Sequence, residues 1–170
     1  MRTLLRVALA GTLLGPCSAV FAQSSADDAL NACLQAAKQQ HQGIVTGWTI
    51  SKGGAGNEID MTMVGLQDKT WKLVCTNGTL GDAAGRFGGM DYQMLSSRKA
   101  IPEVSARATA TAAVANSTMQ KMTYGLSWLG KPYYHYYFAT EDGRTSQVDV
   151  NAETGQIDST SSQRVSSSWW

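Results

Sequence analysis

Apolar and polar residues alternate one by one in several runs of this sequence, and this period constrains the fold more than any other feature. In the run 58–66, for example, three apolar residues alternate with Asp60 and Thr62, and the runs 44–51 and 69–76 follow the same period. Because successive side chains of a strand point to opposite faces, this pattern indicates antiparallel strands in a sheet that is covered on one face.

Two helical patterns can supply that cover. Apolar residues recur at helical spacing from Ser25 to about Gln40, and again from Pro102 to Ala115. Each pattern precedes three strand-like runs, and the second set spans 119–128, 132–140 and 145–151, with a last short strand around Gln156 and Ile157. This order predicts an α+β fold with two repeats of a helix packed on a three- to four-stranded antiparallel sheet. Whether both repeats share one sheet is left open.

The predicted segments are a signal peptide at 1–22, a first helix-plus-sheet repeat at 23–76, a Gly-rich connector at 77–100, a second repeat at 101–158 and a Ser-rich tail at 159–170. Glycine interrupts the connector repeatedly, so we expect it to be flexible, with one short helical turn near 91–95. Because the tail is rich in serine, we expect it to be disordered.

The N-terminus has the features of a secretory signal peptide. Arg2 and Arg6 precede the apolar run 7–14, and the small residues Val20 and Ala22 suit cleavage after Ala22. The apolar run is shorter than the about 20 residues that span a bilayer. We therefore expect a bacterial protein that is periplasmic or secreted.

Two other interpretations of the N-terminus stay open. The apolar run can form a buried helix of the mature fold, and Cys17 can become the lipidated first residue of a lipoprotein. Pro16 stands where lipoprotein signals usually have a small residue, and the site at Ala22 competes with cleavage before Cys17. We therefore expect no lipid anchor at Cys17.

Cleavage at Ala22 leaves 148 residues with a net charge of −1, because Arg2 and Arg6 are removed. A nucleic-acid binder needs a basic patch, so we expect no nucleic-acid partner. No later apolar run reaches membrane length, so we also expect no stable membrane insertion.

Cleavage also removes Cys17 and leaves Cys33 and Cys75. An even number of cysteines in an exported chain predicts a disulfide, which would tie the first helix to the third strand. A reactive thiol or a metal site is the alternative. Neither cysteine has a Cys or His close by in the sequence, which favours the disulfide.

The sequence offers no evident catalytic constellation. Its two histidines, His41 and His135, have no nucleophile or metal ligands at a recognisable spacing, and there is no dinucleotide or phosphate-binding glycine motif. We therefore expect a non-enzymatic protein without a metal or cofactor. A small hydrolase is the weakest of the three functional classes considered.

Six aromatic side chains follow one another from 133 to 138. In a strand they must face both ways, and if Tyr134, Tyr136 and Phe138 face the helix, then Tyr133, His135 and Tyr137 face outward. Tyrosine suits interfaces because it combines a large contact area with a polar tip. Tyr133, His135 and Tyr137 are therefore candidate partner-binding residues, and cover by another part of the chain is the alternative.

The sequence ends in Trp169 and Trp170. Exposed apolar surface tends to be used, so this pair either packs back on the protein or contacts a partner or a membrane surface. The pair is a second candidate binding site.

Three features of residues 101–158 form a recognisable pattern: the aromatic strand Tyr-His-Tyr-Tyr-Phe at 134–138, the turn Thr-Glu-Asp-Gly at 140–143, and the segment from Val148 to Ile157 with its Thr-Gly pair. With this pattern, residues 101–158 resemble a PepSY domain. Asn151 stands where the family usually has Asp. The first half resembles the family much more weakly, through 71–78.

The resemblance implies a helix packed on an antiparallel sheet in an exported or envelope protein. Some members are associated with inhibition of proteases, and the family has no catalytic residues. We therefore expect an exported binding protein that inhibits or modulates a peptidase or another envelope enzyme. The alternative is a structural or sensory envelope module without an enzyme target.

Overall fold

The fold is described from a computed structural model, which covers residues 18–164 apart from 54–55, 82, 88–90 and 99. Most of the predicted signal peptide, including Cys17, lies outside these described residues, and so do Trp169 and Trp170. The predicted cleavage site after Ala22 falls near the start of the first helix.

The three α-helices of the described residues are α1 (Ser18–Gln40), α2 (Tyr92–Ser96) and α3 (Glu103–Ala113), and a 3₁₀ turn spans Leu66–Asp68. Helix α1 ends where predicted but begins at Ser18 and not at Ser25. The residues before Ser25 include no glycine or proline back to Ser18, so nothing in them stops the helix from starting earlier. Helix α2 confirms the short helical turn predicted near 91–95.

The strands are β1 (Gly43–Gly53), β2 (Gly56–Gly65), β3 (Lys69–Thr76), β4 (Thr79–Leu80), β5 (Ala84–Phe87), β6 (Ser117–Leu126), β7 (Pro132–Thr140), β8 (Arg144–Asn151) and β9 (Ile157–Arg164). In the described part of the chain they form one antiparallel sheet in the order β4-β3-β2-β1-β6-β7-β8-β9, with β5 also paired to β3. The coarse α+β prediction is confirmed, and both halves belong to one sheet.

The two halves of the sheet meet at a short joint between β1 and β6. Only three residue pairs form there, from Gly47↔Thr123 to Thr49↔Lys121, although each strand has ten or more residues. Gly47 allows this close approach, since a Cβ at Gly47 would stand 3.3 Å from the carbonyl oxygen of Met122. The sheet is therefore continuous but narrow at its centre.

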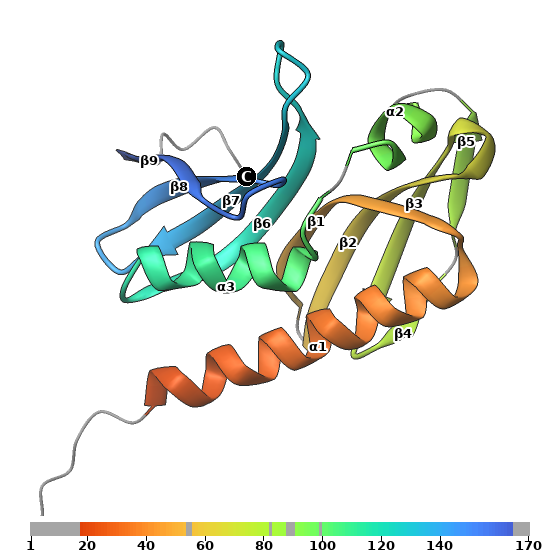
Figure 1. The fold of residues 1–170 in the computed structure, drawn as a ribbon. Helices are drawn as coiled ribbons and strands as arrows, with labels where there is room; N and C mark the ends of the chain where they lie inside the picture. The colour runs from red at the N-terminus through yellow and green to blue at the C-terminus, as the bar shows by residue number, and fades with distance from the viewer. Residues whose placement is uncertain (1–17, 54–55, 82, 88–90, 99, 165–170) are drawn as a thin grey trace, which may run out of the picture.

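Both long helices lie on the same side of the sheet (Figure 1). Helix α1 contacts β1 to β4, and α3 contacts β7 and β8. We call this side the helix-covered face and the opposite side the open face. The core lies between the helices and the sheet, and its largest fully buried side chains include Trp48, Tyr136, Phe138, Leu30 and Ile59.

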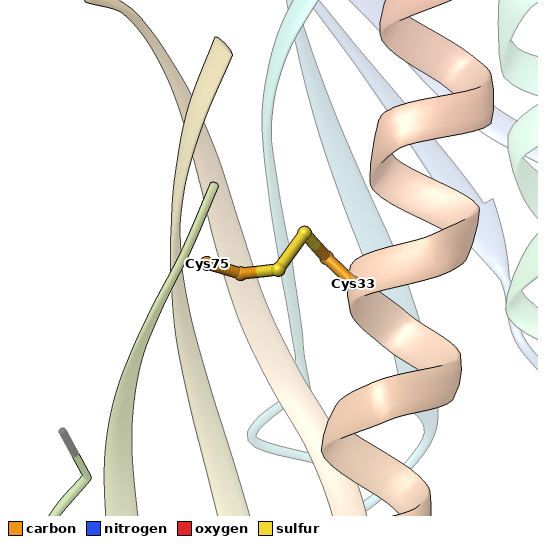
Figure 2. Close-up of a disulfide and its surroundings, with 2 residues drawn as sticks. All are labelled: Cys33 and Cys75. Atoms are coloured by element: carbon orange, nitrogen blue, oxygen red, sulfur yellow. A yellow bond between two sulfur atoms is a disulfide. The ribbon is translucent and has the colours of Figure 1, made fainter. Parts of the chain in front are cut away.

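A disulfide joins Cys33 of α1 to Cys75 of β3 (Figure 2). Both cysteines are fully buried, and their Cα atoms are 5.8 Å apart. The predicted pairing is confirmed, and it ties the first helix to the sheet across 42 residues of sequence.

Two segments contain more regular structure than the sequence predicts. The connector 77–100 includes β4 and β5, which pair with opposite ends of β3. The prediction of a disordered tail from Ser159 is wrong as far as Arg164, because these residues continue β9 and pair with β8. All side chains of β9 are exposed, so backbone pairing and not apolar burial holds this edge strand.

Candidate functional site

Strand β7 divides its aromatic run between the two faces of the sheet. Tyr134, Tyr136 and Phe138 are buried on the helix-covered face. The hydroxyl of Tyr134 donates to the carbonyl oxygen of Ile101 at 3.0 Å, and that of Tyr136 donates to the carbonyl oxygen of Glu103 at 3.2 Å. Burial raises the pKa of both tyrosines, so their hydroxyls remain donors that hold the start of α3.

Tyr133, His135 and Tyr137 lie on the open face, as the alternation predicts, and each is half-buried. The rings of Tyr133 and His135 stack with their centroids 6.0 Å apart. The ammonium group of Lys121, on the neighbouring strand β6, lies 5.4 Å from the ring centroid of Tyr137. These side chains therefore form an ordered aromatic row and not three separate exposed residues.

Asp149 of β8 fixes the orientation of His135. Its Oδ1 atom is 2.6 Å from Nδ1 of His135 and accepts a hydrogen bond from Gln147 at 2.7 Å, and its Oδ2 atom accepts one from Ser159 at 2.6 Å. Burial works to raise the pKa of Asp149, but these hydrogen bonds and the nearby histidine lower it on balance. The carboxylate therefore stays ionised and turns the other ring nitrogen of His135, Nε2, away from itself.

Strand β9 also contributes to this face. The hydroxyl of Tyr133 donates to Oδ2 of Asp158 at 2.7 Å, and this hydrogen bond raises the pKa of Tyr133. Asp158 lies where the pairing between β8 and β9 shifts by one residue, which places its side chain within reach of Tyr133. The edge strand thus fixes both Tyr133 and Asp149.

A shallow hollow of about 370 Å³ lies beside the aromatic row, across the joint between the two halves. Gly47 is one of its lining residues and adds no side chain to fill it. The polar side chains that line the hollow are those of Thr49, Asp60, Thr62, Lys72, Lys121 and Thr123. The open face therefore combines a hollow with hydrogen-bonding groups and an adjoining aromatic surface.

This arrangement is suited to binding by hydrogen bonds and ring contacts. The described residues contain no group of three side chains placed to hold a metal ion. The remaining histidine, His41, packs its ring on Trp71 at the end of α1, with the ring centroids 4.4 Å apart. Trp71 belongs to β3, which is four strands from β7 in the sheet order, so His41 lies far from the aromatic row. We assign this ring contact to the packing of the end of α1.

The structure brings together three of the predicted binding residues, Tyr133, His135 and Tyr137, while Trp169 and Trp170 lie outside the described residues. Asp149 and Gln147 are residues of this face that sequence reasoning missed. A signal for both exists, because the Asp-Gly turn fixes the hairpin register and places them opposite His135 and Tyr137.

A second polar cluster, also missed, lies on the helix-covered face where α1 meets α3. Arg107 is buried, and its Nη2 donates to Oδ1 of Asn31. Its Nε lies 3.6 Å from Oε1 of Glu103, and its Nη1 lies 3.9 Å from Oδ1 of Asp27. Burial raises the pKa of both carboxyl groups, against the opposing effect of Arg107. This cluster joins the two helices and is centred on the buried Arg107, so we assign it to stability.

Comparison with known proteins provides a fold likeness only. No family model matches the sequence, and no curated protein matches it. Among solved structures, the chain is similar to a protein of Clostridium difficile 630 described as a "putative lipoprotein", with a TM-score of 0.50 and 10% sequence identity over 82% of this chain and 93% of that chain. In the described part of the chain, no helix has the length and apolarity to cross a membrane.

Proposed function

We propose that this protein is an exported, non-enzymatic binding protein that engages its partner through the open face. The observation that carries the proposal is the ordered aromatic row, in which Asp158 holds Tyr133, Asp149 holds His135, and Lys121 lies over Tyr137, while all three rings stay partly exposed. Ordered aromatic side chains bind at a low entropy cost because their conformations are already restricted. Neither long helix covers the aromatic row on this face, so a partner can reach it there (Figure 1).

The partner class we favour is a peptidase or another envelope enzyme, which the protein would inhibit or modulate by covering part of its surface. The resemblance of residues 101–158 to PepSY domains supports this choice. So does the order of one helix followed by an antiparallel meander, which occurs in α1 to β4 and again in α3 to β9. A structural or sensory envelope module is the alternative.

The predicted signal peptide supports an envelope or extracellular location. The structurally similar protein of Clostridium difficile is described as a "putative lipoprotein". A form of this protein that is lipidated at Cys17 is therefore the alternative to a cleaved, unlipidated form. Labelling of the expressed protein with palmitate distinguishes the two forms. We expect an unlabelled mature chain that begins after Ala22, whereas label on a chain that begins at Cys17 establishes the anchored form.

The binding proposal is tested by using the mature protein as bait in an envelope or periplasmic extract and assaying the captured enzyme for inhibition. We expect the double variant Tyr133→Ala/Tyr137→Ala to lose capture and inhibition while its thermal stability stays close to that of the native protein. Phe87→Ala is the matched control, since Phe87 is exposed on β5, at the opposite end of the sheet.

The outcomes separate the alternatives. A stoichiometric protease or lysozyme whose activity falls on binding supports inhibition. Recovery of cell-wall material alone, or of no partner, contradicts it and favours the structural or sensory module. Loss of stability in the double variant would mean that the aromatic row supports the fold instead of a partner.

A further inference from the structure

The turn between β6 and β7 displays two large apolar side chains to solvent. Trp128 is 92% exposed and Leu129 is 62% exposed, and they are adjacent at the tip of the hairpin. Trp128 is the most exposed large apolar residue of the described part of the chain. A tryptophan in water at this position contributes nothing to the core, so its apolar surface is available for a contact.

Hydrogen bonds hold this tip in one conformation. The N–H of Gly130 donates to the carbonyl oxygen of Ser127 at 2.8 Å, and the N–H of Ser127 donates to the carbonyl oxygen of Lys131 at 2.8 Å. The N–H of Lys131 donates to the Ser127 hydroxyl at 3.2 Å. Gly130 has a φ of 74°, which suits glycine. The tip is therefore a built turn that presents Trp128 and Leu129 outward.

Cationic side chains flank the apolar tip. Lys131 is next to it in the sequence, and the exposed Arg98 lies against it, since a Cβ at Gly130 would stand 3.3 Å from Nη2 of Arg98. Glu153 lies within electrostatic range of Tyr124 together with Arg98, so one acidic group partly offsets these two cations. The local charge stays positive, which complements an anionic surface.

We propose that the tip formed by Trp128 and Leu129 is a peripheral anchor that inserts into the interface of an anionic lipid bilayer, with Lys131 and Arg98 against the headgroups. Tryptophan favours the boundary between headgroups and acyl chains, and cations beside it add attraction to anionic lipids. Two side chains at one apex are too small for a standard protein interface, which buries about 800 Å² on each partner. They are sufficient for a shallow, reversible lipid contact.

The anchor differs from the binding site of the open face. It lies on the turn that precedes β7, and its function depends on neither Tyr133 nor His135. It would bring the protein to a membrane surface and leave the open face free, and it requires no membrane-spanning segment.

The test is co-sedimentation of the mature, disulfide-bonded protein with vesicles of phosphatidylglycerol and phosphatidylethanolamine, compared with vesicles of phosphatidylcholine alone. We expect binding to the anionic vesicles that weakens with salt. Trp128→Ser/Leu129→Ser should weaken it about tenfold or more, because the apolar contact is lost. Lys131→Gln should weaken it about fivefold, because one cation is lost.

The matched control is Phe87→Ser, which removes an exposed aromatic side chain near the opposite end of the sheet and should leave binding unchanged. Unchanged thermal unfolding of each variant shows that the fold is intact. The proposal is overturned if the native protein does not bind anionic vesicles, as expected of a tip that fits a protein pocket instead. It is also overturned if Phe87→Ser weakens binding as much as Trp128→Ser/Leu129→Ser does.

Discussion

The two faces of the sheet use similar polar side chains in opposite ways. On the helix-covered face, Arg107 and Tyr136 are buried and Glu103 is largely shielded from solvent, and the hydroxyl of Tyr136 donates to the carbonyl oxygen of Glu103. On the open face, His135 and Asp149 form a closer pair, with 2.6 Å between Nδ1 and Oδ1, but remain partly accessible to solvent. The layer above a polar pair, more than the pair itself, therefore decides whether it is available to a ligand.

The same contrast extends to stability. The helix-covered face contains the disulfide, the apolar core and a buried charge cluster, whereas the open face contains hydrogen bonds between half-exposed groups. Changes to the helix-covered face should therefore alter the free energy of unfolding, and changes to the open face should alter binding. This division can be tested at four places, in order of decreasing effect.

The largest effect is expected from removal of the disulfide. Cys33→Ala/Cys75→Ala should lower the free energy of unfolding by about 4 kcal/mol, because a closed loop of this length restricts the unfolded chain. Chemical denaturation of the native and variant proteins measures the change. Reduction of the native protein is the independent control, and an unchanged midpoint in both experiments contradicts the prediction.

The next effect is expected at the buried arginine. Arg107→Met should lower the free energy of unfolding by about 3 kcal/mol, because it leaves the mostly buried carboxylate of Glu103 without its neighbouring guanidinium. Adding Glu103→Gln should restore part of the loss. Arg144→Met is the matched control, because Arg144 pairs with Asp142 at the solvent-exposed surface. We expect this variant to change the free energy of unfolding much less than Arg107→Met does. Equal losses in both variants would contradict the contrast between enclosed and exposed pairs.

A smaller difference is expected between two tyrosines of β7. Tyr136→Phe should cost about 1 kcal/mol, because it removes the part-buried hydrogen bonds of the hydroxyl to Glu103. Tyr133→Phe removes a hydroxyl from the exposed hydrogen bond to Asp158, so we expect almost no change in stability. Thermal unfolding of the two variants measures the difference, and a reversed order would contradict the assignment of faces.

The smallest effect concerns pH, and it has opposite signs on the two faces. The folded-state pKa of Glu103 is raised above 4.5, so its ionisation lowers stability as the pH rises from 4.5 through the raised value. The folded-state pKa of Asp149 is lowered below 3.8, so the stability it provides is lost as the pH falls from 3.8 through the lowered value.

Denaturation midpoints measured from about pH 3 to pH 7 separate these contributions. Glu103→Gln should remove the decline on the higher-pH side, and Asp149→Asn should reduce the loss on the acid side. Each variant is the control for the other, because Glu103→Gln should leave the acid-side loss unchanged and Asp149→Asn should leave the decline at higher pH unchanged. Parallel profiles for both variants and the native protein would contradict the opposite signs.

Several elements could be predicted from the sequence because local pattern determines them. The strands β2, β3, β7 and β8 follow the alternation to within about two residues, and the burial of Tyr134, Tyr136 and Phe138 against α3 follows from the same period. The disulfide could be predicted as well, since an exported chain with two cysteines on core-facing positions has one natural pairing.

Other elements depend on partners that are distant in the sequence. Strand β9 has no apolar period and forms because β8 offers it a free edge. Arg107 is one basic residue in an alanine-rich helix, and nothing local indicates that Asn31 and Asp27 of α1 will enclose it. Its burial was therefore beyond sequence reasoning.

Which side chains share a face follows from the sequence alone, because a strand alternates and a helix repeats by fixed geometry. Which face is covered does not, since both helices settle on one side of a single sheet joined through three residue pairs at β1 and β6. That choice depends on tertiary contacts between segments far apart in the chain, and it leaves His135 and Asp149 accessible while enclosing Arg107.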